Sequence, residues 1–508
     1  MVKVAERKVY ERVIRGRYRY RDVYTFLPVG NYKEYNYGDM SVYAKGDDES
    51  FNAFMEKPYI VLQQADHALL ITPKWTGIRA GWLVNQNESF YVYRVDRFAL
   101  WAGLIPEGLK DEFDLEAKFK TLRLEQGYLV GSEEELREAW KRYRPDLLRR
   151  ERGKGIRVKA GRLVSLSLKL IKDGVIPWTP KTVRATWKWK TDIQLRPYQK
   201  EALDFWLRHG SMTLLFPFGG GKTFTAIAAI SAVSDKTLIV VPSLTLVGQW
   251  VRALKKHLSG PRIGEYSGER KTEGDVIVAT YQTALDKLAR RKWRLLIFDE
   301  GHHYPAPSYS RLAFLDADYR LTLTGTPWRE DGHSEYIYLL GGYPYGSDWN
   351  RLVKEGWIRK PPVYLHVTAA KLWTLKRLVQ RLAAPLLVFC DTVALGKEAA
   401  KALGIPYVYG VHSVKKRLEM VEKHKRLIVS RVFDEGISLP ELRTVIEYDM
   451  LFGSRRQEAQ RAGRLLHSVY EGTEYHIIMT PEELEKYGKR LQSLYARDFE
   501  IKLVKEGG

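Results

Sequence analysis

Residues 217–223 read Pro-Phe-Gly-Gly-Gly-Lys-Thr, and this stretch decides the fold class. The apolar run MTLLFPF leads into it and the run AIAAISAV follows, so we expect it to join a buried strand to the start of a helix. Glycines in such a turn let backbone N–H groups close on phosphate oxygens, and the helix N-terminus adds positive potential. The stretch therefore predicts a phosphate-binding loop for ATP and Mg²⁺. Its expected roles are phosphate contact by Gly219, Gly220, Gly221 and Lys222, and Mg²⁺ ligation by Thr223.

A pair of carboxylates strengthens this interpretation. The general loop pattern begins with a glycine where this chain has Phe216, so a purely structural Gly-rich turn is the alternative for the loop alone. The run RLLIFDE, however, places Asp299 and Glu300 at the end of an apolar strand, where two carboxylates are costly unless they hold a cation or transfer protons. We predict Asp299 as a Mg²⁺ ligand and Glu300 as the base that orients the attacking water. A helix N-cap is the alternative for either residue alone. His302 is expected to link the nucleotide state to the neighbouring domain rather than to bind zinc, because the chain has one cysteine.

Outward from the loop, short apolar runs alternate with helical segments, which is typical of parallel sheets covered by helices. One set of runs is MTLLFPF, TLIVVP, DVIVAT, RLLIFDE and YRLTLTGT, and a second set is PLLVFC, PYVYG, RLIVS, TVIEY and EYHIIMT. We therefore predict an α/β protein with two successive parallel-sheet domains and a seam in GGYPYGSDWN. Residues 1–190 differ in composition and are expected to form an α+β accessory domain, followed by domains at 191–345 and 346–508.

A cluster of arginines lies in the second half of the chain. The segment GSRRQEAQRAGRLLH places four arginines around Gln460, namely Arg455, Arg456, Arg461 and Arg464. Alone, such a cluster is usually a solvated basic helix face. Beside a phosphate-binding loop it indicates an arginine finger that meets the γ-phosphate across a domain cleft.

Taken in order, these motifs resemble the motif series of superfamily 2 helicases, and their detail is closest to XPB-type DNA helicases and translocases. The resemblance covers residues 191 to about 467 and implies two tandem RecA-like motor domains. It implies an adenine-recognition role for Gln199 in LRPYQ, with Arg196 beside it, and a motif III role for Thr324 and Thr326 in LTGTP. It also implies a DNA-unwinding element at Arg329, Glu330 and Asp331.

The chain departs from the family pattern at several positions. The last arginine of motif VI is His467 here, so Arg464, with Arg461 nearby, is left to act as the finger. The usual aspartate of motif V is Ser438, which weakens a ribose contact there. Residues 362–386 are short beside the helical thumb insertion of XPB, which bears on strand separation and on partners that dock there.

The resemblance also implies where the nucleic-acid track runs. Small hydroxyl and amide groups suit phosphate contacts that ignore base sequence. For each candidate alone, a turn or helix-cap role is an equal alternative. The candidates are Ser243, Thr245, Thr280, Gln282, Ser430 and Arg431.

The net charge of the chain also indicates a nucleic-acid partner. The 508 residues carry a formal net charge of +22, and such a basic excess indicates a polyanionic partner. Alternating basic and aromatic residues at 15–21 and a basic stretch at 149–190 favour a DNA-engaging accessory domain over a merely exposed face. The single Cys390 lies in an apolar run, which favours a buried thiol over a nucleophile.

These observations predict an ATP- and Mg²⁺-dependent DNA helicase or double-strand translocase in repair, recombination or fork remodelling. The resemblance implies 3′-to-5′ movement. An RNA helicase and a DNA-binding scaffold with a degenerate ATPase are the alternatives. We expect a cytoplasmic, DNA-associated monomer without a membrane segment, with a nuclease or repair factor as a candidate partner.

Overall fold

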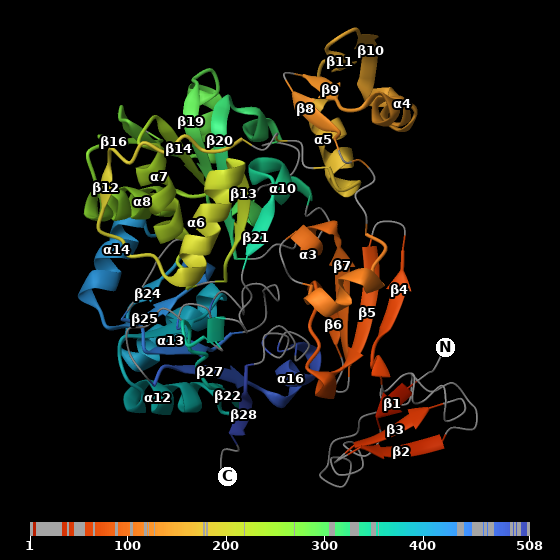
Figure 1. Ribbon diagram of the computed structural model, residues 1–508. Helices are drawn as coiled ribbons and strands as arrows, with labels where there is room; N and C mark the ends of the chain where they lie inside the picture. The colour runs from red at the N-terminus through yellow and green to blue at the C-terminus, as the bar shows by residue number, and fades with distance from the viewer. Residues whose placement is uncertain are drawn as a thin grey trace. The chain divides into compact units, whose positions relative to one another are not determined.

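The fold is taken from a computed structural model, which divides the chain into two compact units, Met1–Glu116 and Ala117–Gly508 (Figure 1). The residues that the structure describes are 4–6, 33–37, 40–44, 56–64, 67–86, 90–101, 105–115, 119, 121–125, 127–175, 178, 181–217, 219–268, 270–303, 310–325, 335–346, 352–353, 355–433, 441–449, 461, 465, 472–487, 491, 494 and 499–504. Among them, no helix is both long and apolar enough to cross a membrane.

The first unit consists mainly of antiparallel strands. A three-stranded sheet joins β1 (Val4–Glu6), β3 (Met40–Ala44) and β2 (Lys33–Tyr37). A four-stranded sheet has the order β4-β5-β7-β6, with strands Ile60–Gln63, His67–Pro73, Phe90–Asp96 and Trp82–Gln86. Burial alternates along β5 and β7, so each presents one face to the core and one to solvent.

The second unit begins with a small sheet of order β10-β11-β9-β8. Its strands are β8 (Arg123–Glu125), β9 (Tyr128–Val130), β10 (Leu147–Glu151) and β11 (Gly155–Val158). Helices α4 (Glu133–Arg142) and α5 (Leu163–Lys172) share a core with this sheet. Residues 181–190, which the sequence assigned to the accessory domain, instead contact the first parallel-sheet domain: Val183 lies in that domain's core, and Lys190 pairs with Ser259.

The first parallel-sheet domain is an eight-stranded sheet of order β17-β16-β18-β14-β19-β20-β13-β21. All neighbours are parallel except the edge strand β17. The strands are β13 (Ser211–Leu215), β14 (Thr237–Val241), β16 (Ile263–Ser267), β17 (Arg270–Thr272), β18 (Val276–Thr280), β19 (Trp293–Phe298), β20 (Ala317–Thr324) and β21 (Pro344–Gly346). Helices include α6 (Pro197–His209), α7 (Lys222–Val233), α8 (Leu244–His257) and α10 (Glu335–Gly341).

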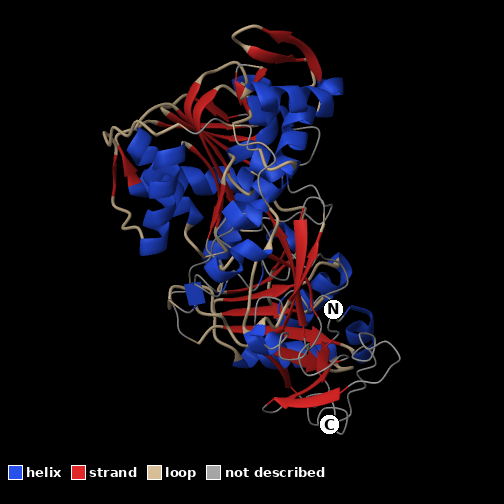
Figure 2. Ribbon diagram, turned by 45° about the vertical axis from the view of Figure 1, so that its right-hand side comes forward, coloured by secondary structure: helices blue, strands red, loops and turns tan. Residues whose placement is uncertain are grey.

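The second parallel-sheet domain is a seven-stranded, all-parallel sheet of order β24-β25-β23-β26-β27-β22-β28. The strands are β22 (Val363–Val367), β23 (Leu386–Phe389), β24 (Tyr407–Val408), β25 (Arg426–Val429), β26 (Thr444–Glu447), β27 (Glu474–Met479) and β28 (Ile501–Val504). Helices include α12 (Lys371–Arg381), α13 (Val393–Leu403), α14 (Val414–Lys423) and α16 (Pro481–Tyr487). Helices flank the strands of both parallel sheets (Figure 2).

The predicted α/β architecture is confirmed, because every apolar run named from the sequence forms a strand of one of these two sheets. The passage between the domains lies later than the stretch chosen from the sequence. Leu352 and Ile358 are buried in the core of the first domain, and β22 opens the second at Val363.

Candidate nucleotide and nucleic-acid site

The glycine-rich loop connects β13 to α7 as predicted. All five residues of β13 are buried, and α7 begins at Lys222 directly after Gly221. Gly219 and Gly221 have φ values of 88° and 74°, a left-handed conformation that favours glycine. A Cβ atom on Gly221 would lie 2.0 Å from the side-chain nitrogen of Gln199, so a larger residue cannot fit there.

Lys222 places its ammonium group over this loop. Its Nζ atom donates to the carbonyl oxygens of Phe216 at 3.2 Å and Pro217 at 3.5 Å. Burial lowers the pKa of Lys222, and the nearby carboxylates of Glu300 and Asp299 act against that shift. The lysine therefore lies within electrostatic reach of both predicted catalytic carboxylates. Thr223 follows on the first turn of α7 and is partly exposed.

Gln199 lies in the first turn of α6, and its side chain contacts the glycine-rich loop. Its Nε2 atom donates to the carbonyl of Gly220 at 3.0 Å, and its Oε1 atom accepts from the backbone N–H of Arg196 at 2.9 Å. The side chain is buried, and both ends of its amide are engaged by the protein. The Arg196 guanidinium donates to the carbonyl of Trp357 at 3.0 Å. These contacts tie α6 to the loop, and adenine recognition by Gln199 and Arg196 stays a prediction.

Asp299 is held in a fixed position at the end of β19. The Trp250 indole donates to its Oδ2 atom at 2.8 Å, and the backbone N–H of Glu300 donates to its Oδ1 atom at 2.9 Å. Burial raises the pKa of Asp299, while the Trp250 hydrogen bond and the Lys222 charge oppose the rise. Neither Trp250 nor the Tyr281 hydroxyl, which donates to the Asp299 carbonyl at 2.9 Å, was identified from the sequence.

Glu300 has a left-handed backbone conformation, and its carboxylate begins a chain of polar contacts through His302 to Thr324, called the polar relay below. Its φ of 49° is left-handed, which costs a non-glycine residue about 1–3 kcal/mol and is typical of functional sites. Its Oε2 atom lies 3.3 Å from Nδ1 of His302, and the same ring nitrogen lies 2.8 Å from Oγ1 of Thr324. His302 and Thr324 are both buried. The polar relay thus joins the predicted base to the motif III position within the first domain, whereas the sequence had assigned His302 a link to the neighbouring domain.

Replacing Trp250 with phenylalanine should raise the pKa of Asp299 further, because the indole N–H stabilises the ionised carboxylate. Activity that needs ionised Asp299 is present above this pKa and is lost as the pH falls through it. We therefore expect the acidic limb of kcat/KM for ATP hydrolysis to move to higher pH. Trp373→Phe, at an exposed position on α12, is the control. Superimposable acidic limbs for the Trp250 variant and the parent chain would contradict this role.

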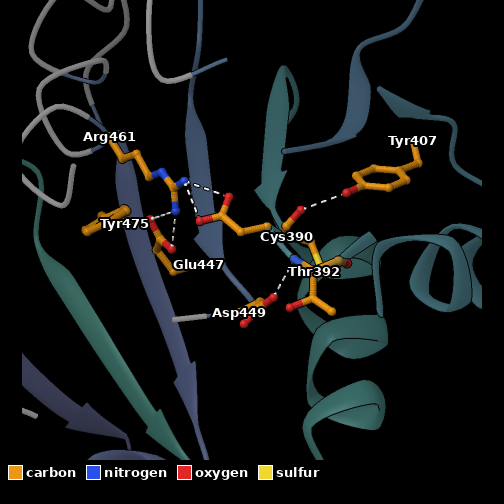
Figure 3. Close-up of polar contacts among 8 residues, drawn as sticks. Cys390, Thr392, Tyr407, Glu447, Asp449, Arg461 and Tyr475 are labelled. Atoms are coloured by element: carbon orange, nitrogen blue, oxygen red, sulfur yellow. Dashed lines mark hydrogen bonds and ion pairs between the residues drawn. The ribbon is translucent and has the colours of Figure 1, made fainter. Parts of the chain in front are cut away.

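Arg461 lies inside the second domain, where it contacts two carboxylates (Figure 3). One guanidinium nitrogen donates to Glu447 at 2.9 and 2.8 Å, and the other donates to Asp391 at 2.9 and 3.1 Å. The guanidinium centre lies 4.3 Å from the centre of the Phe389 ring, and the Tyr475 hydroxyl donates to Glu447 at 3.2 Å. Arg461 is 2% exposed. In this structure Arg461 forms a clamp: its guanidinium ion-pairs with Asp391 and Glu447 and so joins the C-terminal ends of β23 and β26. The prediction that Arg461 helps Arg464 to act as the arginine finger is corrected accordingly.

The neighbouring Cys390 is buried, and burial raises the pKa of its thiol to about 12. This agrees with the prediction of a buried thiol. Beside it, the backbone N–H of Thr392 donates to Asp449 at 2.7 Å, and the Tyr407 hydroxyl donates to the Cys390 carbonyl at 3.0 Å (Figure 3).

The predicted track residues lie at or just after the C-terminal ends of β14, β18 and β25. Ser243 caps α8 by accepting from the Leu246 N–H at 3.3 Å. The Thr280 and Thr283 hydroxyls are 2.9 Å apart, and the Gln282 amide donates to Asp286 at 2.9 Å. Three of the six therefore have the local turn and cap contacts that were the alternative. The other three, of which Arg431 alone is exposed, are Thr245, Ser430 and Arg431.

Several predicted residues lie outside the described part of the chain. They are Thr326, Arg329, Glu330, Asp331, Ser438, Arg455, Arg456, Gln460, Arg464 and His467, together with residues 15–21. Their predicted roles stay predictions.

Comparison with known proteins gives one family match in each of the two parallel-sheet domains. Residues 192–329 match the family described as type III restriction enzyme, res subunit, and residues 370–498 match the ERCC3/RAD25/XPB C-terminal helicase family. A putative DNA 3′-5′ helicase Rad25 of Haloarcula marismortui is 36% identical over 313 residues, which cover 54% of this chain and 50% of that protein. The DNA 3′-5′ helicase XPB of Mycobacterium tuberculosis is 31% identical, over 55% of this chain and 59% of that protein.

The chain thus spans about half the length of these curated relatives. Among solved structures, a variant of S. cerevisiae Dbp5 bound to RNA and ADP BeF3 aligns with a TM-score of 0.51 at 16% identity, over 60% of this chain and 89% of that one. This likeness concerns the tandem RecA-like fold alone.

Proposed function

Because residues 192–329 match the type III restriction enzyme res-subunit family and residues 370–498 match the ERCC3/RAD25/XPB C-terminal helicase family, we propose that this chain is an XPB-type superfamily 2 helicase that hydrolyses ATP to move along DNA. The observation that carries the proposal is that Lys222 contacts the glycine-rich loop and lies close enough to Asp299 and Glu300 for their charges to act on its pKa. A scaffold with a degenerate ATPase has no need to keep a buried carboxylate and a left-handed glutamate beside a phosphate loop.

The loop and its lysine supply the binding part of the reaction. Backbone N–H groups of the loop and the start of α7 would surround the phosphates, since α7 directs its unpaired N–H groups toward the loop. Lys222, now on the carbonyls of Phe216 and Pro217, would exchange these contacts for the β- and γ-phosphates. Because burial makes its ammonium costly to leave unpaired, an anion at this position is favoured.

Mg²⁺ fits the donors present, because it prefers hard oxygen ligands and keeps several waters. Asp299 and Thr223 would hold it, and when bound it would neutralise charge developing on the phosphates. Trp250 keeps the Asp299 carboxylate oriented. Glu300 would accept hydrogen from the attacking water, while His302 restrains the Glu300 carboxylate.

The second domain would contribute Arg464 to the γ-phosphate, with Gln460 beside it. Arg461, which is ion-paired with Asp391 and Glu447, would position this segment. Opening and closing of the two domains would then change the grip of the track residues on a strand. We further propose 3′-to-5′ movement and a role in DNA repair, recombination or fork remodelling, with the chain acting as a DNA-associated monomer and a nuclease or repair factor as its partner.

Steady-state ATPase assays test this proposal. Rates are compared without nucleic acid and with single-stranded DNA, forked duplex and RNA, for the parent chain and for Lys222→Ala. We expect stimulation by DNA that exceeds stimulation by RNA and that disappears in the variant. Equal or greater stimulation by RNA would replace DNA with RNA as the track. Absence of hydrolysis under all conditions would overturn the motor proposal.

A further inference from the structure

The β10–β11 hairpin carries a concentration of positive charge that the motor does not use. Residues 147–158 read LLRRERGKGIRV, with five basic residues and one acidic residue. One face of the hairpin is apolar, since Leu147, Ile156 and Val158 pack into the core shared with α4 and α5. The hairpin is therefore a supported element whose charged residues are held on a packed sheet.

Two arginines oppose each other on the outer face. Arg149 and Arg157 are cross-strand partners in the ladder, and their side chains are 67% and 51% exposed. Like charges directly opposite on a sheet destabilise it. Glu151 is the carboxylate within reach, 3.1 Å from Arg149 and 3.7 Å from Arg157, and it also accepts from the Tyr128 hydroxyl at 2.9 Å. One carboxylate thus serves two guanidinium groups, which leaves net positive charge on this face.

The turn adds two further cations. Arg152 and Lys154 are both exposed at the tip of the hairpin. Gly155 holds the turn close to the sheet, with a φ of 102° and no room for a Cβ atom, which would lie 2.3 Å from the carbonyl oxygen of Leu129. Arg150 differs from these residues because it is ion-paired with Glu133 on α4. The four cations available to a ligand are therefore Arg149, Arg152, Lys154 and Arg157.

We propose that these four residues form a docking surface for the sugar–phosphate backbone of duplex DNA, bound without reading its bases. The proposal rests on the proposed function and assigns it a second DNA contact outside the motor domains. Exposed guanidinium groups match phosphate oxygens bidentately, and a two-stranded ribbon has the dimensions of the major groove. An acidic protein fits less well, because Leu148 is the one exposed large apolar residue of this hairpin and protein interfaces rely on buried aromatic or apolar anchors.

The test is equilibrium binding of the full chain to a labelled duplex, without ATP, over a range of salt concentrations. One variant carries Arg149→Gln, Arg152→Gln, Lys154→Gln and Arg157→Gln. The matched control carries Lys255→Gln, Lys256→Gln, Arg270→Gln and Lys271→Gln, which removes the same charge from four exposed residues of the first motor domain. Thermal melting and DNA-free ATPase rates of both variants should equal those of the parent.

We expect the hairpin variant to bind at least tenfold more weakly, with the slope of log K against log salt reduced by about 3.6, since each of the four phosphate contacts contributes about 0.9. The control should stay close to the parent. Equal losses in both variants, or parental binding by the hairpin variant, would overturn the docking surface and leave the motor proposal intact. Failure of the parent chain to bind DNA would overturn both proposals.

Discussion

Replacing Glu300 with glutamine is expected to lower kcat for ATP hydrolysis by about 10²- to 10⁴-fold, the contribution usual for a positioned general base. Glutamine has nearly the shape of glutamate and can still accept a hydrogen bond near His302, but it cannot take a proton from the attacking water. Nucleotide affinity should change little, because Lys222 and the loop glycines are intact. The measurement is kcat with DNA present, together with equilibrium binding of a fluorescent ATP analogue.

The control for this variant is Glu422→Gln, the same change at an exposed position on α14. It should leave kcat unaltered. Because Glu300 has a left-handed backbone, the unfolding midpoint of its variant is measured as well, so that a folding defect is not taken for a catalytic one. A Glu300→Gln chain that folds and retains kcat within about twofold of the parent would remove Glu300 from the mechanism.

Replacing Arg461 with methionine is expected to lower the free energy of unfolding by about 3–5 kcal/mol, because it leaves buried carboxylates without their cation. Glu447 and Asp391 both accept two bonds from this one guanidinium, and their side chains are 0% and 1% exposed. Arg461→Lys retains the charge, but an ammonium group cannot bind both carboxylates as the guanidinium does. An intermediate loss of unfolding free energy is therefore expected. Denaturant unfolding followed by fluorescence measures these changes.

Two comparisons separate this clamp from a finger that acts on ATP. Arg381→Met, at an exposed position in the same domain, should leave stability unchanged. Adding Glu447→Gln to Arg461→Met should recover part of the loss, since one uncompensated charge is removed. If Arg461→Met abolished hydrolysis while the unfolding curve stayed parental, the arginine would act on the nucleotide and the clamp would be wrong.

Local chemistry explains what could be predicted. The ten apolar runs named from the sequence are all strands. Nine of them are central strands, which are buried on both faces and need continuous apolar residues, and the tenth forms the edge strand β24. The edge strands β17 and β28 were not predicted, because they contain exposed polar residues and each pairs with only one neighbouring strand. The domain seam was placed too early because Leu352 and Ile358 return to the first core after a glycine-rich stretch that looks like a linker.

By itself, the sequence determined the two parallel-sheet domains, the phosphate loop between β13 and α7, and the carboxylate pair after β19. Loop glycines and strand-end carboxylates can be recognised because each pattern lies within a few consecutive residues. Only the tertiary structure decided how distant residues act on them. Trp250 reaches Asp299 from 49 positions away, and Arg461 reaches Asp391 from 70. The direction in which a side chain points depends on the partners that folding brings to it, and a buried arginine and an exposed finger have the same letter in the sequence. The fold therefore turned Arg461 inward, and it made the opposed arginines of the β10–β11 hairpin into a single charged surface.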